Sequence, residues 1–149
     1  MAKLYVLCGI PGAGKTTAAY RIDPYAKVHS YDDVFESNRN ADINHSSFQT
    51  WVSNIRSDLL AERNVVCDST NLTVLLRKNL LKQFCDIDCE KNLVVFSTPI
   101  EECKKRNAGR KRILPDFVIT QSAKMMEMPT LDEGWDNIYL WKDDEETQQ

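Results

Sequence analysis

Residues 9–16 (Gly-Ile-Pro-Gly-Ala-Gly-Lys-Thr) combine glycine, lysine and threonine at the spacing of a phosphate-binding loop. Glycine lets successive backbone N–H groups turn inward as a nest for an anion, and a following helix adds the partial positive charge of its N-terminus. Lys15 is then placed to reach the β- and γ-phosphates of a nucleoside triphosphate, and the Thr16 hydroxyl to ligate Mg²⁺. The loop follows an apolar run, residues 3–8, and opens a helical pattern, which favours this interpretation over a chance glycine-rich turn. The predicted nucleotide-binding residues are Gly9, Pro11, Gly12, Ala13, Gly14, Lys15, Thr16, Thr17 and Arg110.

Two aspartates, Asp32 and Asp33, directly follow a second expected strand, residues 26–30. A carboxylate at that position can accept the proton of an attacking hydroxyl, as a general base must. The alternative is that both acids stabilise the N-terminus of the next helix, where carboxylates are favoured. Residue types alone leave the two aspartates nearly equal as candidates for the base.

The segment Asp68-Ser69-Thr70-Asn71 follows another hydrophobic run, residues 64–67. Asp68 is a candidate to hold a metal-bound water or the acceptor of a transferred group. Thr70 and Asn71 either contact the acceptor as well or only cap the helix that begins near Thr73.

A basic stretch runs from Cys103 to Arg112 and contains no acid. Arg106 and Arg110 are four residues apart and would share one face if the helix there continues. Guanidinium groups pair bidentately with phosphate oxygens and can neutralise charge on a transferring phosphoryl group. We therefore predict a lid with Arg106 and Arg110 as catalytic residues, in preference to a solvated basic surface.

Strand and helix patterns alternate along the chain. Expected strands cover residues 3–8, 26–30, 64–67, 93–96 and 137–141. One expected helix begins at residue 15, and four others cover residues 46–63, 74–84, 100–107 and 116–127. This order predicts an α/β fold with a parallel sheet and helices on both faces. Ligands bind such sheets beyond the carboxyl ends of the strands, so residues 9–16, Asp32 and residues 68–71 are expected to converge there.

The composition is that of a soluble globular protein: 149 residues, 42% hydrophobic and 28% charged. We expect one domain over residues 1–142 and an acidic, frayed tail over 143–149. No apolar run reaches the ~18 residues of a membrane span, and the N-terminus lacks the features of a signal peptide, so a cytoplasmic location is expected.

The five cysteines do not form a paired framework, so reduced thiols are preferred to a zinc site at Cys85 and Cys89. The net charge of −3 argues weakly against a nucleic-acid partner. Trp51, Trp135 and Trp141 belong either to the core or to an interface, which leaves the oligomeric state open.

Taken together, these motifs resemble the kinase domain of polynucleotide 5′-kinases, the RNA and DNA end-healing enzymes of phages and bacteria. The likeness covers nearly the whole chain: GIPGAGKTT at 9–17, HSYDD at 29–33, DSTN at 68–71, KKRNAGRKR at 104–112 and MPTLDEGWDNI at 128–138. It implies an adenylate-kinase-like P-loop fold of about five parallel strands with a basic lid. It further implies transfer of phosphate from ATP, or another nucleoside triphosphate, with Mg²⁺, onto 5′-OH RNA or DNA ends.

The resemblance also implies roles for particular residues. It favours Asp32 over Asp33 as the general base and matches the family's lid arginine to Arg110, with Arg106 as a second candidate. Predicted acceptor-binding residues are Asp32, Arg39, Asp68, Thr70, Asn71 and Arg77.

Two departures from the family stand out. Several members carry an arginine three residues after the catalytic aspartate, where it contacts the acceptor's 3′-phosphate; here that position is Phe35, and Arg39 is the nearest arginine. Many members also carry a phosphatase domain, which this sequence does not contain, so ends are expected to be phosphorylated without trimming, in the host cytoplasm if the protein is of phage origin.

Two other functions compete with this one. A kinase of a small hydroxyl compound, such as a nucleoside, sugar or antibiotic, fits the low positive charge, because counterion release would then contribute less to binding. A nucleotide-dependent switch or binding module fits less well, since the Asn-Lys-x-Asp signature of its guanine-specific form does not occur in the sequence.

Overall fold

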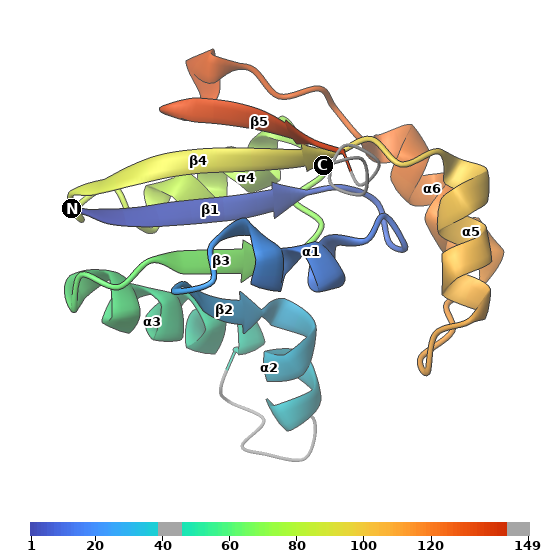
Figure 1. Cartoon of the computed structure of the whole chain (residues 1–149), viewed down its shortest axis with the longest axis horizontal. Helices are drawn as coiled ribbons and strands as arrows, with labels where there is room; N and C mark the ends of the chain where they lie inside the picture. The colour runs from blue at the N-terminus through green and yellow to red at the C-terminus, as the bar shows by residue number, and fades with distance from the viewer. Residues whose placement is uncertain (39–45, 143–149) are drawn as a thin grey trace.

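The computed structural model describes residues 1–38 and 46–142 and contains one sheet of five parallel strands in the order β2-β3-β1-β4-β5. Figure 1 shows the strand arrows running in the same direction, towards α5 and α6. The strands are β1 (Ala2–Cys8), β2 (Lys27–Ser30), β3 (Val65–Asp68), β4 (Cys89–Phe96) and β5 (Asn137–Trp141). The predicted parallel sheet is therefore confirmed, although β4 begins at Cys89 rather than near Leu93.

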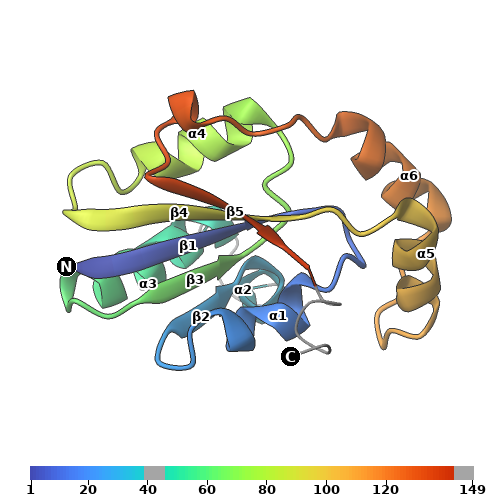
Figure 2. The same cartoon turned by 45° about the horizontal axis from the view of Figure 1, so that its top comes forward.

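Helices cover both faces of this sheet, as predicted, with α4 on one side and α1 on the other in Figure 2. Their bounds are α1 (Lys15–Ile22), α2 (Tyr31–Asn38), α3 (Ser47–Leu60), α4 (Val74–Lys82), α5 (Ile100–Ala108) and α6 (Asp116–Met125), and one 3₁₀ turn, η1, spans Leu131–Glu133. Side-chain caps begin two of them: the hydroxyls of Ser46 and Thr73 accept from the backbone N–H groups of Gln49 and Leu76.

Two apolar layers hold the helices to the sheet, because alternate residues of each buried strand point to opposite faces. On one face, α3 and α4 pack with Trp135 against strand residues such as Leu4, Val65 and Leu93. On the other face, α1, α5 and α6 pack against Leu7, Val66, Val94 and Phe96. Trp51 and Trp135 are core residues, which settles two of the three tryptophans in favour of the core.

The strand order places the phosphate-binding loop and the aspartates together. The loop follows β1, which lies between β3 and β4 in the sheet. After β1 the chain continues to β2 on one side of the sheet, and after β4 it continues to β5 on the other side. Such a switch point opens a crevice at the carboxyl ends of the strands. β2 and β3 are also neighbours in the sheet, and Ser30 of β2 lies in register with Asp68 of β3. Because α2 follows directly after Ser30, its first turn begins beside the end of β3.

Arg77 is predicted from the sequence to bind an acceptor, but the structure places it in the core with no exposed surface. Its Nε and Nη2 donate to the Glu133 carboxylate at 2.8 and 3.1 Å, and Nη1 donates to the carbonyls of Asn71 and Leu72 at 3.0 and 2.9 Å. Nη2 also donates to the Glu127 carbonyl at 3.0 Å. Every side of the guanidinium is engaged with protein, so Arg77 joins the segments around it instead of facing a ligand.

Other sequence predictions concern Arg39, the tail, membrane spans and the cysteines. Arg39 and the predicted tail over 143–149 lie outside the described ranges. Within the described chain no helix is both long and apolar enough to cross a membrane. The cysteines there are unpaired thiols, and no group of three His, Cys, Asp or Glu side chains is arranged to hold a metal.

Replacing Arg77 by methionine is expected to lower the free energy of unfolding by about 3–5 kcal/mol, because Glu133 would keep a buried charge without its partner. Adding Glu133→Leu should recover part of this loss, since the unpaired charge is then removed as well. Urea unfolding followed by tryptophan fluorescence measures both. Arg56→Met, which breaks an exposed pair with Asp86, is the matched control and should cost much less. An equal loss of unfolding free energy in Arg77→Met and Arg56→Met would contradict the structural role given to Arg77.

Candidate active site

The loop over residues 9–16 adopts a geometry that only glycine accommodates at two of its positions. Gly12 has φ +86° and Gly14, which precedes α1, has φ +93°, both in the left-handed region. A Cβ on Gly12 would also lie 2.4 Å from the Cys103 carbonyl oxygen of α5. The loop is therefore closely packed against α5, and its backbone is free to wrap an anion in front of the α1 N-terminus.

Neighbouring strand ends hold this loop in place. The Gly9 N–H donates to the Thr70 carbonyl at 3.0 Å, which ties the loop to the segment after β3. The Thr98 hydroxyl, after β4, donates to the Ala13 carbonyl at 2.9 Å. Both strands beside β1 thus contribute a hydrogen bond to the loop.

Lys15 is buried at the base of the loop, where its ammonium donates to the Ile10 carbonyl at 2.8 Å. Burial lowers the pKa of Lys15 to about 8; nearby Arg110 acts in the same direction, and the Asp68 carboxylate opposes it. The lysine is therefore held at the phosphate site with a proton that it retains only weakly.

Thr16 and Asp68 form the next layer of the site. The Thr16 hydroxyl donates to Asp68 Oδ2 at 2.9 Å, across 52 residues of sequence. Burial, the largest influence, raises the pKa of the Asp68 carboxyl; Asp32 and Asp33 add to this, and the Thr16 hydrogen bond and Lys15 oppose it. Hydroxyl and carboxylate oxygens side by side suit Mg²⁺, which needs only one or two protein oxygens beside phosphates and water. The residues present thus fit this ion.

A cleft opens over the loop and has two connected parts, of about 700 and 590 Å³. The loop part contains Lys15, Thr16 and the residues after β3, and the α2 part contains Tyr20, Ser30, Asp33 and Glu36. Residues that line both parts mark the junction: Thr16, Asp32, Asp68, Arg110 and Arg112. Both volumes are in the range of small-molecule sites.

Asp32 and Asp33 lie in the first turn of α2, as the capping alternative predicts, and only Asp32 reaches both parts of the cleft. Being in the first turn does not exclude a role in chemistry, because Asp32 also faces the loop. Asp33 lines the α2 part alone.

The helix before the lid loop ends close to its predicted end at residue 107 and does not continue to Arg110. α5 ends at Ala108, so Arg106 lies in its last turn and Arg110 in the loop beyond, yet both line the loop part of the cleft. The lid loop is closed at its base by Asn107, whose amide donates to the Leu114 carbonyl at 2.7 Å and accepts from the Leu114 N–H at 3.0 Å. At its far side, Arg112 forms an ion pair of 2.8 Å with Glu36 of α2.

Several of these residues are not among those predicted from the sequence, and their signals are weak. Asn107 lies inside the basic stretch, one helical turn after the buried Cys103, and only this spacing hints that it faces inward. Other cleft residues outside the predicted set are Tyr20, Val28, Ser30, Tyr31, Asp33, Glu36, Ser69, Lys111, Arg112 and Leu114.

Three predicted acceptor residues take different places. Thr70 lines the cleft. Asn71 is buried, with φ +46°, and its amide donates to the Leu7 carbonyl at 2.7 Å, so it fixes the backbone after β3. Neither Asn71 nor Arg77 lines the cleft described above.

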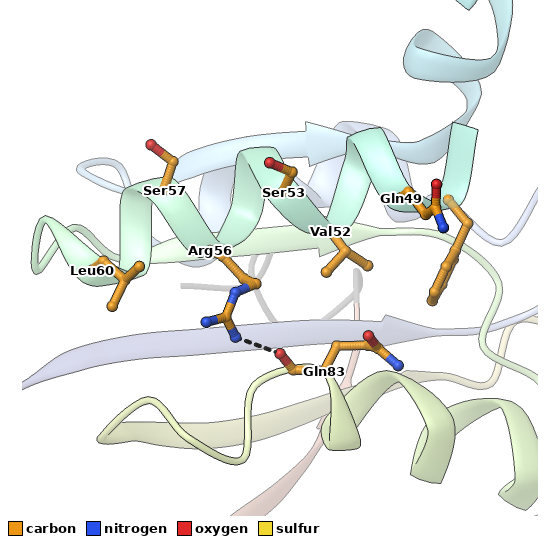
Figure 3. A pocket seen from close by; sticks show the side chains of 8 residues that line it. Gln49, Val52, Ser53, Arg56, Ser57, Leu60 and Gln83 are labelled. Atoms are coloured by element: carbon orange, nitrogen blue, oxygen red, sulfur yellow. Dashed lines mark hydrogen bonds between the residues drawn. The ribbon is translucent and has the colours of Figure 1, made fainter. Parts of the chain in front are cut away.

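A separate hollow of about 510 Å³ lies along α3 (Figure 3). Arg56 reaches across it and donates to the Gln83 carbonyl at 2.7 Å, and it also pairs with Asp86 through two bonds. None of the predicted site residues lines this hollow. Its one charged lining residue is already paired, so we place the site at the loop.

The parallel sheet carries a phosphate-binding loop at its switch point, and Asp32 and an arginine-bearing lid face this loop. This is the fold of the P-loop kinases. The chain belongs to the AAA domain family, whose model matches residues 4–129. A search of curated proteins gives no match.

Solved structures share this fold at low sequence identity. A putative kinase from Chloroflexus aurantiacus is 14% identical, with 94% of this chain and 84% of that chain covered and a TM-score of 0.72. A gluconokinase from Sinorhizobium meliloti 1021 is 14% identical, with coverages of 93% and 81% and a TM-score of 0.62. A fungal RNA kinase is 15% identical, with coverages of 95% and 38% and a TM-score of 0.66. At these identities the likeness shows the fold alone.

Nucleotide affinity is expected to fall by up to tenfold per pH unit above about pH 8. In the protein without nucleotide, the pKa of Lys15 is about 8. A bound polyphosphate favours the ammonium form of Lys15, so nucleotide binding above that pH takes up a proton. Calorimetric titration of ATP at pH 7 and pH 9, in two buffers of different ionisation enthalpy, measures this uptake. Lys15→Arg is the control, because its guanidinium stays charged at both values. The same proton uptake in that variant would assign the titration to another group.

Proposed function

We propose that this kinase transfers the γ-phosphate of ATP to the 5′-hydroxyl end of RNA or DNA. The observation that carries the proposal is the position of Asp32, at the junction where the loop, the end of β3 and the lid arginines meet. A hydroxyl beside Asp32 would be next to the triphosphate on the loop, which is the arrangement in-line transfer requires.

Each group at the junction has a role in this transfer. Asp32 accepts the proton of the attacking 5′-hydroxyl, and Lys15 contacts the β- and γ-phosphates. Arg110 and Arg106 neutralise charge on the transferring phosphoryl group and the leaving ADP. The oxygens of Thr16 and Asp68 offer positions for Mg²⁺, which supplies further charge neutralisation at the triphosphate when bound.

The cations around the α2 part support a polynucleotide acceptor. Arg110, Lys111 and Arg112 are consecutive and all line this part of the cleft. A transferred phosphoryl group needs few positive partners, whereas an acceptor with its own backbone phosphates uses more. The order of motifs that resembles polynucleotide 5′-kinases supports the same acceptor.

A kinase of a small hydroxyl compound is the second candidate, favoured by the fold likeness to a gluconokinase and by the net charge of −3. The two differ in their response to salt, because an acceptor with several phosphates releases counterions on binding. KM for a 5′-OH oligonucleotide should rise steeply between 50 and 200 mM salt. Labelled ATP with RNA, DNA, nucleosides and sugars as acceptors tests the choice directly.

Replacing Asp32 by asparagine is expected to lower kcat by roughly 10²–10⁴-fold, because the amide cannot accept the proton of the hydroxyl. ATP affinity should change little, since the loop is intact. Transfer of labelled γ-phosphate to a 5′-OH oligonucleotide, alongside calorimetric ATP binding, measures both. Asp33→Asn is the matched control and should retain most of the activity. The reverse pattern, with Asp33→Asn inactive, would assign the base to Asp33.

A further inference from the structure

Phe35 is an aromatic side chain that the proposed reaction leaves without a role. It lies on α2, three residues after Asp32, and 49% of it is exposed. Residues three and four apart share a face of a helix, so Phe35 is one turn from both Asp32 and Tyr31. A single exposed apolar residue is ordinary on a protein surface, and its neighbours therefore decide its significance.

Those neighbours form an ordered row of rings. The Phe35 and Tyr31 ring centroids are 6.4 Å apart with an interplanar angle of 26°, which is a stacked pair. Tyr31 in turn meets Trp51 edge to face, at 5.6 Å and 85°. Trp51 is buried, and its Nε1 donates to the His29 carbonyl of β2 at 2.9 Å. The row is thus anchored in the core at one end and exposed at the other.

The row also borders the cleft. Tyr31 lines the loop part together with Asp32, Ser69 and Thr70. Next to Phe35, Glu36 forms an ion pair of 2.8 Å with Arg112 of the lid, which offsets part of the negative charge of α2. An exposed ring stack beside the proposed general base suits a flat, uncharged group attached close to the acceptor hydroxyl.

We propose that the Tyr31–Phe35 pair is a stacking surface for the first nucleobase of the acceptor. This rests on the proposed function and narrows it. Bases stack on aromatic side chains without sequence preference, because every base has a π-face. The surface therefore selects a nucleotide end over an acceptor without a base, and it does so at the position where an arginine is expected from the resemblance to polynucleotide 5′-kinases.

The test compares two 5′-OH oligonucleotides that differ only in the first nucleotide, which carries a base or is abasic. For the unmodified protein, kcat/KM with the base should exceed that without it by about tenfold, the size of one stacking contact. In Phe35→Ala and Phe35→Leu the ratio should fall to about one or two, and Phe35→Tyr should restore it. Phe117→Ala, which removes another exposed phenylalanine outside the cleft, is the matched control and should keep the ratio of the unmodified protein.

A ratio near one in the unmodified protein, or an unchanged ratio in Phe35→Ala, overturns the stacking surface while oligonucleotide phosphorylation stands. Failure to phosphorylate either oligonucleotide overturns the proposed function, and the stacking surface with it. Because the ratio compares two acceptors on the same variant, a loss of folded protein cancels and does not imitate the expected result.

Discussion

The buried guanidinium of Arg77 is the interaction on which the arrangement around the site depends. It bonds the carbonyls of the segment after β3, the carbonyl of Glu127 after α6, and the Glu133 carboxylate just before β5. Glu133 also accepts from the Trp135 indole at 3.1 Å and closes η1 through its bond with the Thr130 N–H. Burial alone would raise the pKa of the Glu133 carboxyl, but its hydrogen bonds with Arg77, Trp135 and Thr130 together lower it. The charge pair thus joins three chain segments, two of which are also linked where the Glu127 N–H donates to the Leu72 carbonyl at 2.9 Å.

A series of side-chain and backbone hydrogen bonds connects these segments to the cleft. The Asn71 amide fixes the segment after β3 to the end of β1, and the Thr70 carbonyl receives the first N–H of the phosphate loop. Thr16 then connects α1 to Asp68 at the end of β3. At the centre, burial lowers the pKa of Lys15 and raises the pKa of the Asp68 carboxyl, and the attraction between these two groups opposes both shifts.

Much of this architecture follows from local sequence. Glycine spacing identified the loop, and the alternation of strand and helix patterns predicted five parallel strands and the convergence of residues 9–16, Asp32 and Asp68 at their carboxyl ends. What sequence did not reveal depends on contacts between distant residues. Arg77 and Glu133 are 56 positions apart, and the Asn71 amide bonds a carbonyl 64 positions away, so neither is distinguishable from a polar surface residue by pattern. The spacing of Arg106 and Arg110 left open whether the helix continues between them; Gly109 follows the end of α5 there.

The contact between Arg112 and Glu36 has a consequence for how firmly the lid is held against α2. Both side chains are partly exposed, at 50% and 38%, and a pair of this kind contributes about 0–1 kcal/mol. Losing this pair therefore changes the stability of the lid's position by at most about 1 kcal/mol, roughly a fivefold change in an equilibrium constant.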